Sequence, residues 1–123
     1  MAGPSLIALA AAAVLVGAGA PSAGTAGPPA VVRVTTLGTN GGAILNKGRA
    51  QPANLLEVDG KAYLIDAGAG TLRQLAQVGV SPMRIDQIFI THNHIDHNAD
   101  WPLLMAHAYV VGRRTPMTVL GPG

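Results

Sequence analysis

Three of the four histidines of this 123-residue chain lie within six positions, and an aspartate lies among them. His92 and His94 are two residues apart, so in an extended segment their rings project to the same side. Two neutral imidazoles placed in this way can bind one Zn²⁺ at about 2.0–2.1 Å. Asp96 and His97 are adjacent and need a tight turn to point at a common atom, where they could bind a second metal a few ångströms away. The segment therefore predicts a metal centre.

A competing interpretation is a polar loop that is rich in histidine by chance. The residue types, their spacing and their position after an apolar segment favour the metal centre. The chain has no cysteine, so a metal must be held by histidine and carboxylate side chains, and no disulfide framework exists. The fourth histidine, His107, stands alone on a later expected helix. We interpret it as structural or solvent-facing.

An apolar segment that reads as a strand, 85–90, leads directly into these histidines. Sheets in α/β proteins usually place ligand sites at the carboxyl ends of their strands. The dipeptide Asp59-Gly60 predicts a two-residue hairpin between two earlier strands, because both turn positions need positive φ. The order of elements indicates an α/β layer architecture with helices on a mostly buried sheet. We expect strands at 31–37, 54–58, 61–66, 85–90 and 118–120, and helices at 72–78 and 101–110.

The expected helix at 72–78 has a start, a stop and an inner face. Thr71 is a candidate N-cap. Leu72, Leu75 and Val78 share one face by their three-residue spacing, which predicts that they face the core. Gly79 is the expected stop.

The first 29 residues differ in composition from the rest of the chain, because they carry no charged side chain. Residues 6–20 form an apolar run that is short for a membrane span, which takes about 20 residues. The run fits a secretory signal peptide, with small-residue cleavage sites at 18–20 and 24–26, although no Lys or Arg precedes it. We therefore expect an exported protein, periplasmic or secreted. The alternative is an Ala/Gly-rich leader without a targeting role.

The charged residues are few and scattered. The formal net charge is +2, and Arg113-Arg114 is the only adjacent basic pair. A nucleic-acid-binding surface would need clustered basic residues with aromatic side chains. We therefore expect a small-molecule substrate and no nucleic-acid partner.

The segment 92–97 matches the His-x-His-x-Asp-His signature of the metallo-β-lactamase superfamily, and the resemblance extends from about Val31 to the end of the chain. The segments 37–39, 64–68 and 88–91 follow the order of the family's motifs. The ending, 119–123, resembles the Gly-Pro-x-Gly segment of the branch that contains transfer-RNA 3′-processing endonucleases, arylsulfatases and phosphodiesterases.

This resemblance implies an αββα sandwich of two similar halves. It also implies two metal ions, Zn²⁺ by expectation, per complete domain, with His92 and His94 as ligands of the first and Asp96 and His97 as ligands of the second. Asp66 matches an aspartate behind the metal ligands, where a carboxylate would orient a ligand histidine. An N-cap or turn role for Asp66 is an equal alternative. Residues 30–123 correspond to the first half only, so the remaining ligands would lie beyond Gly123.

The resemblance further implies a hydrolase that uses a metal-activated water. Asp96 would hold one metal and orient the attacking hydroxide. Phosphate or sulfate esters are favoured as substrates over lactams and lactones, and export argues against transfer RNA. The alternative from another class is a truncated chain without activity.

Overall fold

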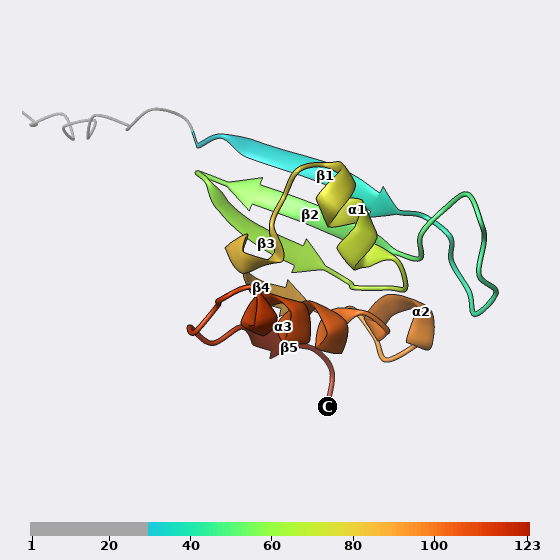
Figure 1. Cartoon of the computed structure of the whole chain (residues 1–123). Coiled ribbons are helices and arrows are strands. Elements are labelled where there is room, and N and C mark those ends of the chain that lie inside the picture. The colour runs from blue at the N-terminus through green and yellow to red at the C-terminus, as the bar shows by residue number, and fades with distance from the viewer. Residues whose placement is uncertain (1–29) are drawn as a thin grey trace, which may run out of the picture.

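The computed structural model describes residues 30–123, so the expected leader lies outside the described residues. Five strands form one mixed sheet in the order β1-β2-β3-β4-β5 (Figure 1). The strand β2 is antiparallel to both of its neighbours, β1 and β3, whereas β3, β4 and β5 run parallel. This confirms the expected α/β class. The strands are β1 (Val32–Gly38), β2 (Ala53–Val58), β3 (Lys61–Ile65), β4 (Ile85–Phe89) and β5 (Thr118–Leu120).

The hairpin between β2 and β3 forms where the sequence predicts it. Asp59 has φ 48° and Gly60 has φ 81°, as a two-residue turn of this kind requires. The parallel pairs need crossover connections, and helices supply them. The helical segments are α1 (Thr71–Gln77), the 3₁₀ turn η1 (Pro82–Arg84), α2 (Ile95–Asn98) and α3 (Trp101–Val110).

The two longer helices, α1 and α3, cover the same face of the sheet (Figure 1). Leu75 of α1 and Leu104 of α3 are fully buried against a row of sheet residues. That row is Leu55, Leu64 and Ile88, which are paired across β2, β3 and β4. The core therefore lies between one helix layer and one sheet layer. No helix within residues 30–123 is long and apolar enough to cross a membrane.

The opposite face of the sheet is apolar and uncovered within the described residues. Val34 is 63% exposed and Phe89 is 37% exposed, although both belong to strands. The expectation of a mostly buried sheet is therefore wrong for this face. The sequence still encodes an apolar face here, because Val32, Val34 and Phe89 are aliphatic or aromatic.

The start of α1 differs from the expectation. The N-cap is Gly70, at φ 96°, and not Thr71. The carboxylate of Asp100, thirty residues later, accepts hydrogen bonds from the backbone N–H groups of Gly70 and Leu72. The Thr71 hydroxyl donates to the Gly68 carbonyl instead. A distant aspartate therefore satisfies the helix end that a local hydroxyl was expected to cap.

The end of α1 explains a second difference. The helix ends at Gln77, and Gly79 turns the chain with φ 73°, as the sequence predicts. Val78 falls beyond the last helical residue and is 44% exposed, so its expected place on the inner face is wrong. Val80 is buried instead and joins Leu75 in the core.

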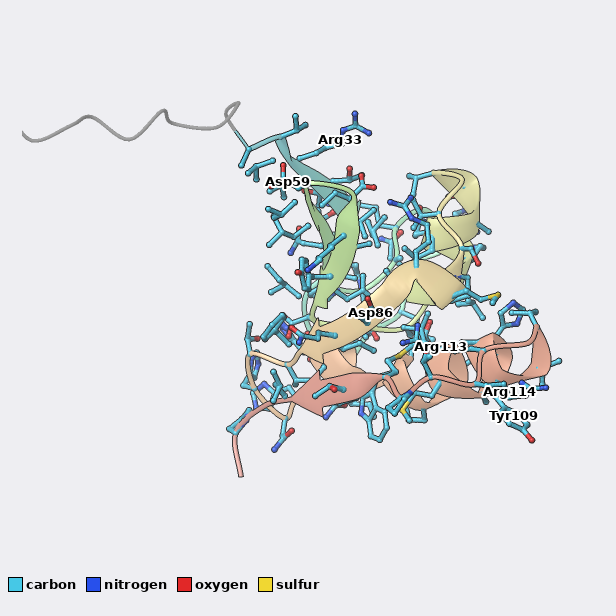
Figure 2. All side chains as sticks on the ribbon, turned by 90° about the vertical axis from the view of Figure 1, so that its left-hand side faces the viewer. Arg33, Asp59, Asp86, Tyr109, Arg113 and Arg114 are labelled. Carbon is cyan, nitrogen blue, oxygen red and sulfur yellow. The ribbon has the colours of Figure 1, made fainter. Side chains whose placement is uncertain are left out.

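Arg113 is buried at the turn that follows α3, and its guanidinium joins this turn to η1 and β4 (Figure 2). Its one carboxylate partner, Asp86, is 65% exposed, so the ion pair is largely solvated. The other partners are the carbonyls of Met83, Ile85, Thr115 and Pro116.

Candidate metal centre

The predicted site residues lie where β4 ends, in the segment 91–98 that contains α2. In Figure 1, α2 is close to the long loop that connects β1 to β2. A hydrogen bond from this loop to α2 confirms the proximity. The site therefore lies at the carboxyl ends of the parallel strands β3 and β4, as expected for an α/β sheet.

The rings of His92 and His94 lie edge to face, with His92 Nε2 3.2 Å from His94 Nδ1. Two atoms that bind one tetrahedral metal at 2.0–2.1 Å are about 3.3–3.4 Å apart. The observed separation is close to that edge length. This pair of nitrogens is therefore spaced as two ligands of one metal would be.

Asp96 and His97 form a second pair of the same dimension. They lie in the single turn of α2, which supplies the tight turn that adjacent ligands need. His97 Nε2 is 3.5 Å from Asp96 Oδ2, again close to a tetrahedral edge. The His97 ring is 4.0 Å from the His92 ring, so the two pairs are neighbours.

Each pair supplies one edge of a coordination sphere. Within residues 30–123, no group of three or more His, Asp or Glu side chains is arranged to hold a metal ion. The donor chemistry fits zinc, because imidazole and carboxylate are zinc ligands. A four-coordinate metal on either pair would take its other ligands from water, substrate or protein groups other than these four.

Asp66 lies behind the second pair. Its Oδ2 is 2.7 Å from His97 Nδ1, and its Oδ1 accepts a hydrogen bond from the Thr91 backbone N–H at 2.8 Å. The Thr91 hydroxyl is 3.0 Å from both carboxylate oxygens. A carboxylate beside Nδ1 favours the neutral tautomer with its proton on Nδ1, in which Nε2 is the nitrogen that can bind a metal.

The geometry of Asp66 also bears on its alternative role. It has φ 62°, so it is a turn residue in the left-handed region, where Asp is tolerated. It does not cap α1, whose N-cap is Gly70. The turn conformation and the contact with His97 therefore coexist.

The glycine-rich loop contributes a contact that the sequence did not reveal. Gly42, at φ 87°, donates its backbone N–H to Asp96 Oδ2 at 2.6 Å. This hydrogen bond holds the pKa of Asp96 below its ordinary value, and the nearby His97 and His94 act in the same direction. Neither the type nor the spacing of the residues in this loop, which connects β1 to β2, indicated the contact.

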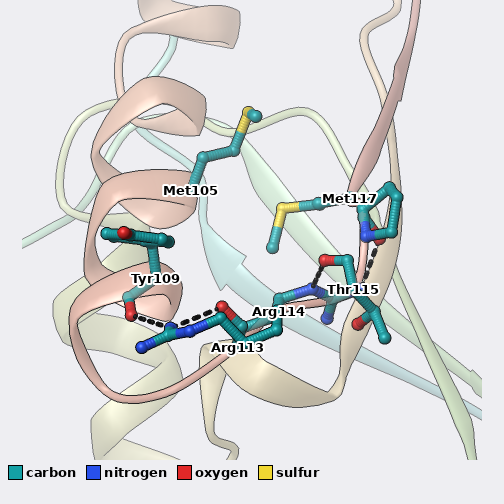
Figure 3. A pocket seen from close by; sticks show the side chains of 7 residues that line it. Met105, Tyr109, Arg113, Arg114, Thr115 and Met117 are labelled. Atoms are coloured by element: carbon teal, nitrogen blue, oxygen red, sulfur yellow. Dashed lines mark hydrogen bonds between the residues drawn. The ribbon is translucent and has the colours of Figure 1, made fainter.

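The remaining sites of interest lie elsewhere. A cavity of about 300 Å³ is lined by Met105, Tyr109 and Met117 together with Arg113 and Arg114 (Figure 3). Both guanidinium groups are already bonded to backbone carbonyls. This cavity contains none of the predicted ligands.

His107 is exposed on α3, as expected. It lines a groove of about 430 Å³ between α1 and α3, together with Arg73 and Leu103. The structure therefore places His107 apart from the cluster of the other three histidines.

Comparison with known proteins gives consistent matches. Residues 47–119 match the family model described as the Metallo-beta-lactamase superfamily. Ribonuclease Z of Methanococcus maripaludis is 44% identical over 91 residues, which are 74% of this chain and 29% of that protein. Human tRNase Z, short form, is 36% identical with a TM-score of 0.65, over 75% of this chain and 34% of that one. The long form RNase Z from yeast is 26% identical with a TM-score of 0.60, over 74% and 14%.

These relatives correct one expectation. Their names are those of ribonucleases, and one is named for tRNA. The expectation of a small-molecule ester substrate without a nucleic-acid partner is therefore wrong. It rested on the scattered basic residues of this chain, which spans only about 29% of the length of the curated relatives it matches. A basic surface that binds RNA need not lie within the part of the protein that this chain covers.

Proposed function

The chain belongs to the metallo-beta-lactamase superfamily, and we propose that its protein is a metal-dependent hydrolase that cleaves phosphodiester bonds of RNA. The observation that carries the proposal is the pair of donor separations, 3.2 Å and 3.5 Å, in neighbouring positions. The ribonuclease Z relatives, at up to 44% identity, support RNA as the substrate class.

In this proposal His92 and His94 hold one zinc ion, and Asp96 and His97 hold the second. Metals held by these residues would lower the pKa of a bound water towards neutrality and would stabilise charge on the phosphate that is cleaved. Asp96 also orients the attacking water. Asp66 keeps the His97 ring in the tautomer and orientation that binding needs, through its contact with Nδ1.

The assay is cleavage of a precursor transfer RNA by the full-length protein loaded with zinc. We expect His92→Ala to abolish cleavage, because it removes one of few metal ligands. His107→Ala is the matched control and should retain cleavage, because His107 is exposed on α3. Failure of the zinc-loaded protein to cleave any RNA would refute the proposal. Undiminished cleavage by His92→Ala would refute the ligand assignment.

The two pairs also predict distinct metal losses. His92→Ala or His94→Ala should empty mainly one site, and Asp96→Ala or His97→Ala mainly the other. Elemental analysis of metal per chain measures this. Full metal content in both Asp96→Ala and His97→Ala would indicate a single-metal site and a different mechanism.

We also propose that the leader directs export, on the strength of its uncharged apolar run at 6–20. Export would bring the enzyme to RNA outside the cytoplasm. The two proposals rest on different observations, one on the leader and the other on the metal centre and its relatives. Together they imply an RNA outside the cytoplasm, so the precursor transfer RNA of the assay serves as a model substrate.

A further inference from the structure

Gln51 is a buried polar residue between two segments that border the metal centre. Its side chain is only 3% exposed. Its Oε1 accepts a hydrogen bond from the Ala69 backbone N–H at 3.2 Å, and its Nε2 donates to the Gly42 carbonyl at 2.8 Å. The reverse orientation of the amide would set donor against donor and oxygen against oxygen, so these partners define it.

The Gln51 backbone makes the position rigid. Its N–H donates to the Ala69 carbonyl at 3.0 Å, so Gln51 and Ala69 are bonded through both main chain and side chain. A side chain added to the adjacent Gly68 would collide with the Asp96 carbonyl oxygen and with Gln51. Gly68 is therefore packed tightly between Gln51 and the backbone of α2.

Gly42 has little else to hold it. It is exposed, and a Cβ built on it would have no atom within 4 Å. Its neighbours Gly41 and Ile44 are also exposed. The carbonyl of Gly42 bonds to Gln51, and its N–H bonds to Asp96 Oδ2 at 2.6 Å. Hydrogen bonds, not packing, set where this residue lies.

We propose that Gln51 is a positioning residue of the metal centre, which acts through Gly42 to fix the carboxylate of Asp96. This inference rests on the proposed function, in which Asp96 is a metal ligand. Gln51 holds the Gly42 carbonyl, Gly42 then presents its N–H to Asp96 Oδ2, and the carboxylate is held 3.5 Å from His97 Nε2. Groups that orient ligands in this way influence metal affinity as well as stability.

The test uses Gln51→Glu, Gly42→Ala and the double variant in the full-length protein. Gln51→Glu keeps the length and the acceptor for Ala69 but removes the donor to Gly42. Gly42→Ala disfavours the positive φ without a steric clash. The matched control is Gln77→Glu, the same chemical change at an exposed position of α1. The readouts are Zn²⁺ and Co²⁺ affinities by titration and the NMR chemical shift of the Gly42 amide proton in metal-free protein.

We expect Gln51→Glu to weaken binding of the metal at Asp96 and His97 by about tenfold. Binding at His92 and His94 should not change. The Gly42 amide proton should shift upfield, because its hydrogen bond to Asp96 is lost. The double variant should bind no more weakly than the weaker single variant, because both changes break the same connection.

Equal losses at both metals, or additive losses in the double variant, would overturn the inference and leave Gln51 a residue of the fold alone. If the unaltered protein binds no metal, the proposed function fails. The Gly42 amide shift then decides this inference by itself, and an unchanged shift in Gln51→Glu would overturn it.

Discussion

Asp66→Asn is the most informative single change at the metal centre. The carboxylate of Asp66 contacts the Thr91 backbone N–H, the Thr91 hydroxyl and His97 Nδ1. Asparagine has the same shape and tolerates the left-handed conformation at φ 62°. It replaces one acceptor oxygen with an NH₂ donor. Because the Thr91 backbone N–H needs the remaining oxygen as its acceptor, the NH₂ group takes the place of Oδ2 and faces His97. Nδ1 must then accept, and the ring proton moves to Nε2, where it blocks metal binding.

The expected loss of zinc affinity in Asp66→Asn follows from the contact between the Asp66 carboxylate and His97. Loss of a partner that orients a ligand histidine lowers metal affinity by about 10- to 100-fold. This corresponds to roughly 1.4–2.7 kcal/mol, since about 1.4 kcal/mol is a factor of ten. The backbone should be preserved, so the free energy of unfolding should change less than the metal affinity does.

The assay is a zinc titration, with ¹⁵N NMR of the His97 ring to identify the tautomer. The control is Asp59→Asn, because Asp59 also has positive φ, at 48°, but lies in the exposed β2–β3 turn. Both changes remove one negative charge. Equal zinc affinity in the two variants, or an unprotonated Nε2 in Asp66→Asn, would refute the role assigned to Asp66.

Three further predictions follow from other parts of the chain. Arg113→Met should lower the free energy of unfolding in urea by roughly 4 kcal/mol, because about 1 kcal/mol is lost for each of its four carbonyl partners. Arg114→Met, at an exposed position, should lower it by less than about 1 kcal/mol. Equal losses in the two variants would contradict this account. Because the hydrogen bond from Gly42 lowers the pKa of Asp96, this carboxylate stabilises the folded protein at pH values above its ordinary pKa of 3.8. This contribution is lost as the pH falls through the lower pKa of the folded state. Gly42→Ala should raise the pKa of Asp96 in a ¹³C NMR titration, and an unchanged pKa would contradict the role of Gly42. Expressed with its leader in a bacterium, the protein should lose about 20–30 residues, as amino-terminal sequencing would show, whereas an intact Met1 on cytoplasmic protein would argue against export.

The elements that the sequence predicted well are those with local signals. The Asp59-Gly60 turn, the stop at Gly79 and the bounds 101–110 and 118–120 are confirmed. Turn chemistry and helix stops depend on residues adjacent in the chain, so they can be read without knowledge of the fold. The residues of the motif at 92–97 lie in two neighbouring pairs, and their role as metal ligands stays a prediction.

The differences come from partners that are distant in the sequence. The start of α1 is bonded to Asp100 and not to the Thr71 hydroxyl, because the fold brings the residue before α3 to this helix end. Gly42 and Gln51 gave no signal by type or spacing, since their contacts span 54 and 9 residues. The substrate class was wrong for a related reason. Scattered charge within one part of a protein does not describe the whole surface that meets RNA.

Three aspartates connect the segment that holds the candidate ligands, or the chain directly after it, to other parts of the fold. Asp66 joins Thr91 to His97, Asp96 is bonded to the glycine-rich loop, and Asp100 is bonded to the start of α1. None of these bonds involves a metal ion. In small domains that fold only around zinc, binding must also supply the free energy of folding. In the proposed metal centre, hydrogen bonds between segments already position the side chains of Asp96 and His97, so we expect metal binding there to reorganise the chain little.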